Sequence, residues 1–123
     1  MVINKLYELT AKELRDKFLS GDLLAVEIVS AFYERIEKVE DKIKSFVSLR
    51  KESALEEARK LDEKKKNGEK LGKLAGIPLA IKDNILMDGE KSTSCSKILE
   101  NYIGIYDSTV VKKLKEEDAI IIG

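Results

Sequence analysis

The segment GIPLAIKDN, residues 76–84, has the pattern of a β-strand that ends on a charge. Apolar residues at positions 77, 79 and 81 alternate with Pro78, Ala80 and Lys82. Such alternation predicts a strand with one buried face, and proline is tolerated at the first position of a strand. Lys82 is the unusual residue, because an ammonium group is costly to bury. It is therefore exposed to solvent, paired with an acid, or used in chemistry.

A helix and a second strand follow this segment. Residues 119–123 read AIIIG, an apolar run of strand length, and residues 108–117 have helical periodicity. A strand, a helical crossover and a strand form a βαβ unit, so we expect the two strands to be parallel neighbours. Lys82 would then lie beyond the carboxyl end of a strand, where open α/β sheets bind their ligands. We expect Asp107 to cap the helix, Val110, Val111 and Leu114 to face inward, and residues 94–101 to hold a short helix.

Three helices are predicted in the first 70 residues. Thr10 and Glu13 form a capping box for a helix that begins at Ala11 and ends at Gly21. A second helix follows almost at once, and a third covers about residues 51–66. A short extended stretch is expected at residues 46–47. The residues expected to face the core are Ala11, Leu14 and Phe18 in the first helix, Leu24, Ile28, Val29, Phe32, Ile36 and Val39 in the second, and Ala54, Leu55, Ala58 and Leu61 in the third. The pairs Glu56–Lys60 and Asp62–Lys66 are expected on the wet side of the third helix.

The composition excludes several classes of function. The 123 residues contain 37% charged side chains with a net charge of zero, so bulk electrostatics attracts neither nucleic acid nor an anionic membrane. Histidine is absent, which removes Ser-His-Asp catalysis and most zinc chemistry. The single cysteine, Cys95, cannot form an internal disulfide. No signal peptide or membrane-length apolar run is visible, so we expect a soluble cytoplasmic protein with no membrane contact.

The pattern predicts an α/β fold built in two parts. Residues 1–70 would form an N-terminal helical region, and residues 71–123 would begin an α/β core. A parallel strand is normally covered on both faces by later helices, and two parallel strands leave the edges of their sheet open. We therefore expect the chain to be the opening, truncated part of a larger α/β domain.

Two further groups of residues invite a functional interpretation. STSCS, residues 92–96, holds hydroxyls and the only thiol, but a nucleophile there would need a lysine as its base. A polar loop that caps a helix is the simpler interpretation. The lysines at 64–66, 70 and 73 could contact RNA, although a solvated helix C-terminus explains them better.

Several motifs together resemble the amidase signature family. They are LAGIPLAIKDNI (74–85), TSCSKILENY (93–102) and YDSTVVKKLKEEDAIIIG (106–123). The front segment TAKELRDKFLSGDLLAVEIVSAFYERIEKVE (10–40) is similar to the N-terminal helical pair of one branch of that family, the glutamine-hydrolysing A subunits of tRNA-dependent amidotransferases. The resemblance covers essentially all 123 residues and implies that the strands begin a mixed amidase-signature sheet. Leu24 departs from the serine that often caps the second helix in that branch, which puts the start of this helix in question.

The resemblance implies a chemical role for Lys82. Members of the family hydrolyse amides with a serine nucleophile, a bridging serine on a cis peptide bond, and a lysine base at the end of the strand matched here. Both serines belong to a Gly/Ser-rich signature that follows the second strand and has no counterpart within these residues. None of Ser92, Ser94 and Ser96 lies in a matching motif. We therefore expect this chain to contribute the base and to be inactive alone, with Lys82 more exposed than a buried base.

The same resemblance implies a substrate and partners. The glutaminase component frees ammonia from glutamine, and the B subunit uses ATP and Mg²⁺ to activate Glu-tRNA(Gln) and convert it to Gln-tRNA(Gln). A small C subunit clasps the pair, tRNA binds mainly through the partner component, and this chain itself would bind no cofactor or metal. One alternative is a portion of another family hydrolase that acts on small or fatty amides. An alternative of another class is a non-catalytic helical interaction module, which would have no need of Lys82.

Overall fold

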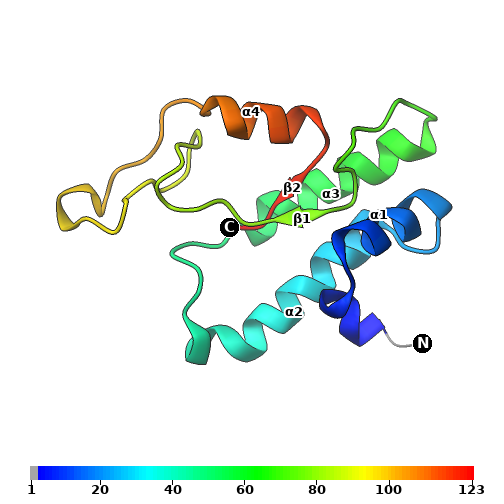
Figure 1. Ribbon diagram of the computed structural model, residues 1–123, viewed down its shortest axis with the longest axis horizontal. Coiled ribbons are helices and arrows are strands. Elements are labelled where there is room, and N and C mark those ends of the chain that lie inside the picture. Colours follow the sequence, from blue (N-terminus) through cyan, green and yellow to red (C-terminus); the bar gives the residue numbers. More distant parts are fainter. Residues whose placement is uncertain (1–2) are drawn as a thin grey trace.

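Three α-helices fill the first half of the chain in the computed structural model, which describes residues 3–123. They are α1 (Ala11–Ser20), α2 (Ala25–Ile43) and α3 (Lys51–Lys66), and the 3-10 helix η1 (Ile3–Glu8) precedes them. Figure 1 shows α3 passing behind a short sheet and α2 running below it, with α1 beside α2. The bounds of α3 agree with the sequence prediction, including its end at Asn67.

The predicted capping box forms at the start of α1. The Thr10 hydroxyl accepts the Glu13 N–H at 3.2 Å, and the Glu13 carboxylate accepts the Thr10 N–H at 2.8 Å. Gly21 ends the helix with φ at 89°, a left-handed conformation that glycine adopts without strain. Leu14 and Phe18 are buried as predicted. The expected burial of Ala11 is wrong, because this first helical residue lies beyond the part of α1 that packs on the core.

The start of α2 differs from the prediction. Leu24 is the extended N-cap residue outside the helix, and its side chain is exposed rather than inward-facing. The Glu27 carboxylate accepts the Leu24 N–H at 2.8 Å, and Asp62 of α3 accepts the N–H groups of Ala25 and Val26 at 2.7 and 3.1 Å. The expected Asp62–Lys66 pair is therefore wrong, because Asp62 caps the neighbouring helix. The Glu56–Lys60 pair is present at 3.8 Å.

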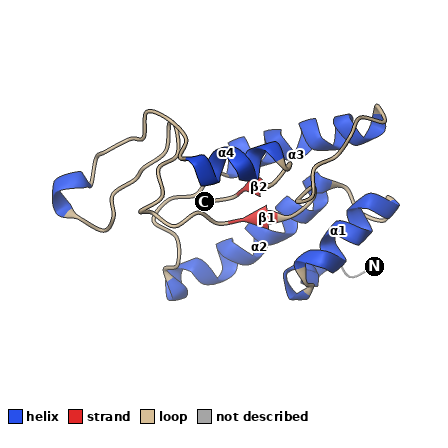
Figure 2. Cartoon of the chain, turned by 45° about the horizontal axis from the view of Figure 1, so that its top comes forward, coloured by secondary structure: helices blue, strands red, loops and turns tan. Residues whose placement is uncertain are grey.

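The second half of the chain contains the predicted parallel strands. It consists of β1 (Pro78–Leu79), the 3-10 helix η2 (Lys97–Leu99), α4 (Thr109–Glu116) and β2 (Ile120–Ile121). β1 and β2 are parallel neighbours, with Pro78 opposite Ile120 and Leu79 opposite Ile121. Figure 2 shows the two strands side by side between the helices, and a long loop region between β1 and α4 that contains only η2. The extended stretch expected at 46–47 is a loop without strand pairing.

The helix α4 is capped differently from the prediction. Ser108 occupies the N-cap position without a side-chain hydrogen bond. The Asp107 carboxylate instead accepts the Asp88 N–H at 2.9 Å and the Lys115 ammonium at 2.7 Å, so it ties the long loop to the helix. Val111 is buried as expected, whereas Val110 is exposed because it faces away from the strands.

Apolar side chains pack on both faces of β2. Ile120 and Ile122 join the larger cluster formed by α1, α2 and α3, while Ile121 packs with Met87 and Val111 on the α4 side. Successive residues of a strand point to opposite faces, so the AIIIG run supplies both clusters. The α/β class is thereby confirmed. The boundary at residue 70 stays a prediction, and the larger cluster contains residues from both sides of it. Among the described residues, no helix is long and apolar enough to cross a membrane.

Candidate functional site

A hollow lies at the carboxyl ends of the two strands. Its volume is about 480 Å³, and its walls come from the loop after α2, from the segment that follows β1, and from the end of the chain. Open α/β sheets bind ligands in this position, because the strand ends leave a crevice between the following loops. The residues on its wall include Phe46, Arg50, Lys82, Asp83, Cys95 and Gly123.

Lys82 stands on the wall of this hollow, three residues after β1. The Ile81 N–H donates to the Gly123 carbonyl at 2.8 Å, so strand pairing continues up to the residue before the lysine. The Ile85 N–H then donates to the Lys82 carbonyl at 2.9 Å and turns the chain. The side chain is exposed, as expected, and within residues 3–123 its ammonium makes no hydrogen bond or salt bridge. The structure therefore places the Lys82 side chain on the wall of the hollow, with no bonded partner among the described residues.

Asp83 is bonded to the loop opposite rather than to Lys82. Its carboxylate accepts the Thr93 N–H at 3.0 Å and also the Thr93 hydroxyl. Desolvation raises the pKa of Asp83, but the hydrogen bonds from Thr93 outweigh it and hold that pKa below its ordinary value. Asp83 is therefore ionised at neutral pH, and its carboxylate can accept both bonds from Thr93.

The STSCS segment is a polar loop, as predicted, but it does not cap a helix. Ser96 at the N-cap of η2 makes no side-chain capping bond, and the segment bonds to Asp83 instead. Ser92 and Thr93 are buried, and Cys95 is an exposed free thiol on the same hollow as Lys82. The hydroxyls of this segment thus help to hold the loop against the segment that carries the lysine.

Arg50 is a site residue that the sequence did not indicate. Its guanidinium donates to Glu90 at 2.6 Å, to Glu57 at 3.1 Å and to the Ile121 carbonyl at 2.7 Å, and only 10% of its side chain is exposed. Burial lowers the pKa of Arg50, but the bonds to Glu90 and Glu57 outweigh this and raise it above its ordinary value. This ion-pair network fixes the end of β2 beside the hollow.

Two more contacts shape the end of β2. The buried Tyr33 hydroxyl donates to the Ile122 carbonyl at 2.5 Å, and burial raises the pKa of this tyrosine. A Cβ atom on Gly123 would lie 2.6 Å from the Phe46 ring and 2.8 Å from the Ser48 carbonyl oxygen. Only glycine lets the loop after α2 pack this closely on the strand end, which closes one wall of the hollow.

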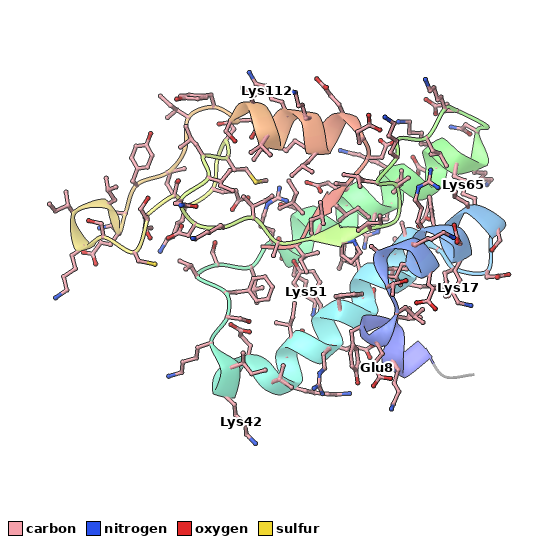
Figure 3. The ribbon with its side chains drawn as sticks, in the orientation of Figure 1. Glu8, Lys17, Lys42, Lys51, Lys65 and Lys112 are labelled. Carbon is pink, nitrogen blue, oxygen red and sulfur yellow. The ribbon has the colours of Figure 1, made fainter. Side chains whose placement is uncertain are left out.

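The lysine-rich end of α3 is less solvated than predicted. Lys64 pairs with Asp118 at 2.9 Å, and the Lys65 ammonium donates to the Phe18 carbonyl and lies 4.8 Å from the centre of the Phe18 ring. Figure 3 shows Lys65 directed toward the end of α1, whereas Lys42 and Lys112 point outward from their helices. Lys64 and Lys65 therefore tie α3 to neighbouring elements. Across residues 3–123, no group of three His, Cys, Asp or Glu side chains is placed to hold a metal ion.

Comparison with known proteins gives a consistent family. A family model described as Amidase matches residues 27–123. The chain is 86% identical, over all 123 residues, to the A subunit of the glutamyl-tRNA(Gln) amidotransferase of Fusobacterium nucleatum, of which it covers 25%. It is 50% identical over 119 residues to the protein of the same name from Carboxydothermus hydrogenoformans, covering 97% of this chain and 24% of that protein.

The fold has counterparts among solved structures. The peptide amidase of Stenotrophomonas maltophilia superposes with a TM-score of 0.89 at 25% identity, covering 97% of this chain and 25% of that enzyme. The chain thus spans about a quarter of the length of the proteins it matches.

Proposed function

This chain belongs to the amidase family, and from that premise we propose that it is the N-terminal quarter of the glutaminase subunit of a tRNA-dependent amidotransferase. The observation that carries the proposal is the 86% identity, over the whole length of the chain, to a protein of that name. This match includes η1 and α1, which lie outside the residues 27–123 that the amidase family model covers.

In the proposed reaction, Lys82 is the base. Its neutral amine takes a proton, through a bridging serine, from the serine that attacks the side-chain amide carbon of glutamine. Both serines would come from another part of the complete glutaminase. The proton then passes to the amide nitrogen, which leaves as ammonia, and water releases glutamate from the acyl-serine. The position of Lys82 on the hollow, with no acid bonded to its side-chain nitrogen among the described residues, supports this role.

The ammonia would serve a larger assembly. We propose that the complete glutaminase works with a B subunit, which uses ATP and Mg²⁺ to activate Glu-tRNA(Gln) and aminates it, and with a small C subunit. The tRNA would contact the B subunit in the main, and the assembly would work in the cytoplasm. The similarity to proteins named for glutamyl-tRNA(Gln) supports this assignment.

The test uses the complete glutaminase in its assembled complex, with Lys82→Ala as the variant and Lys91→Ala as the matched control. Lys91 is an exposed lysine on the wall of the same hollow. We expect Lys82→Ala to lower glutaminase kcat at least about 10²-fold and Lys91→Ala to change it little. Added ammonium chloride should restore Gln-tRNA formation in Lys82→Ala, because free ammonia bypasses glutamine hydrolysis. Unchanged glutaminase activity in Lys82→Ala would refute the role.

A second candidate is hydrolysis of other amides without tRNA. The structural similarity to a peptide amidase favours it, since that enzyme shares the arrangement of this quarter. Assaying the complete protein with glutamine and with a C-terminally amidated peptide separates the two. Faster turnover of the peptide amide would favour this second function over the first.

A further inference from the structure

Asp83 directly follows Lys82 and receives hydrogen bonds from the loop opposite. Its carboxylate accepts the N–H of Thr93 at 3.0 Å and the Thr93 hydroxyl. Its backbone carbonyl accepts the Ser94 N–H at 3.2 Å and, at 3.4 Å, the Ser92 hydroxyl. Three consecutive residues of one loop thus bind a single residue, and we call this set of bonds the Asp83 clasp.

The clasp completes the support of the Lys82 backbone. On the other side of the lysine, the Ile81 N–H donates to the Gly123 carbonyl at 2.8 Å, and Lys82 itself accepts from Ile85 at 2.9 Å. The direction in which a side chain leaves the backbone is set by the residues that hold the backbone in place. The backbone of Lys82 is therefore held in place, while its ammonium has no partner in the described part of the chain.

The partners of Asp83 depend on it. Thr93 and Ser92 are each only 7% exposed. Without the carboxylate, the Thr93 N–H and hydroxyl would be left in a largely buried place with no acceptor, which is unfavourable, so the loop would move to find water. Because Ser92 and Ser94 of the same loop also bond to the Asp83 backbone carbonyl, such a movement would shift the backbone next to Lys82.

From this geometry we propose that Asp83 is a positioning residue for Lys82. By clasping the loop of residues 92–94, it sets the direction from which the lysine reaches the reacting atoms. The inference rests on the proposed function, in which Lys82 is the base. A displacement of about 1 Å at a reacting group can cost roughly 10²-fold in rate, so the clasp should matter for kcat more than for substrate binding.

The experiment compares three variants of the complete glutaminase in its assembled complex. Asp83→Ala removes the two carboxylate bonds of the clasp, and Asp83→Asn keeps an oxygen acceptor for the Thr93 N–H and a polar group for its hydroxyl. Asp107→Ala is the matched control, because Asp107 also ties a loop through its carboxylate, to Asp88 and Lys115, but does not line the hollow. Glutaminase kcat and KM are measured for each variant, and thermal unfolding is followed in parallel.

We expect Asp83→Ala to lower kcat by about 10- to 100-fold while KM for glutamine changes less than about threefold. Asp83→Asn should keep most of the activity, and Asp107→Ala should keep kcat although it lowers the unfolding temperature. The positioning role is wrong if Asp83→Ala keeps wild-type kcat, if Asp107→Ala loses as much, or if Asp83→Asn is as impaired as Asp83→Ala. Retained kcat in Asp83→Ala together with an inactive Lys82→Ala would overturn this inference alone. An active Lys82→Ala would overturn the proposed function.

Discussion

Arg50 is the residue whose loss should most disturb the end of β2. Its guanidinium connects Glu57, Glu90 and the Ile121 carbonyl, while the two carboxylates are 35% and 27% exposed. Arg50→Met would keep the apolar stem but leave both acids and the carbonyl without their donor. We expect the free energy of unfolding to fall by about 2–3 kcal/mol, less than for a fully buried pair because the acids keep some water. Urea denaturation of the 123-residue chain measures this.

The control for Arg50 is an exposed ion pair. Lys12 and Asp16 pair at 2.6 Å on α1, with 84% and 53% of their side chains exposed. Lys12→Ala should lower the free energy of unfolding far less than Arg50→Met does, because water and salt screen such exposed pairs. Equal losses for Arg50→Met and Lys12→Ala would show that the network beside the hollow contributes no more than a surface contact.

Lys82 and Arg50 show which site residues a sequence can reveal. Lys82 could be located because the alternation before it marks a strand, and strand ends are where α/β proteins bind ligands. Arg50 could not, because its partners Glu90 and Ile121 lie 40 and 71 residues further along the chain. Nothing in the local sequence around residue 50 indicates that such distant groups will meet. The ion-pair network around Arg50 therefore became visible only in the three-dimensional structure.

A side chain of α3 caps the N-terminus of α2. Asp62 of α3 accepts the N–H groups of Ala25 and Val26, where Leu24 has no oxygen to offer. A carboxylate at a helix N-terminus also interacts favourably with the helix dipole. Asp62→Ala should therefore lower the free energy of unfolding by about 1–2 kcal/mol, as loss of a helix cap does. Chemical denaturation monitored by circular dichroism measures the change.

Glu63 provides the comparison for Asp62. It is the next residue of α3, it is exposed, and its side chain makes no hydrogen bond or salt bridge with the described residues. Glu63→Ala should leave the stability within about 0.5 kcal/mol of the parent. If both substitutions have the same small effect, the interhelical cap is not stabilising, and the start of α2 depends on Glu27 alone.

The secondary structure was predictable where its signals are local. The Thr10–Glu13 box, the glycine at 21 and the limits of α3 depend on residues within a few positions of each other, and all are confirmed. The two errors of capping and pairing involve residues whose partners are distant. Asp62 and Asp107 were assigned local roles, yet they bond to groups 36 or 37 and 19 residues away. A carboxylate can satisfy several donors, and the tertiary fold decides which ones it meets.

At the scale of the whole molecule, the chain presents open surfaces beside its hollow. Figure 1 shows the long loop between β1 and α4 reaching away from the helices. Large apolar side chains are exposed along it, with Ile98 at 94% and Ile105 at 76% exposure. The matched relatives are about four times as long as this chain.

We therefore expect the 123-residue chain to release no ammonia from glutamine, alone or mixed with the B and C subunits. Base catalysis requires a hydroxyl within hydrogen-bond reach of the lysine, and no hydroxyl of residues 3–123 bonds to Lys82. Ser45 on the same hollow is already bonded to Glu40 at 2.8 Å. Coupled detection of released glutamate, with Lys82→Ala of the same chain as the blank, measures this. Turnover above that blank would mean that the chain itself supplies a nucleophile, and the division of labour proposed for the complete glutaminase would have to be abandoned.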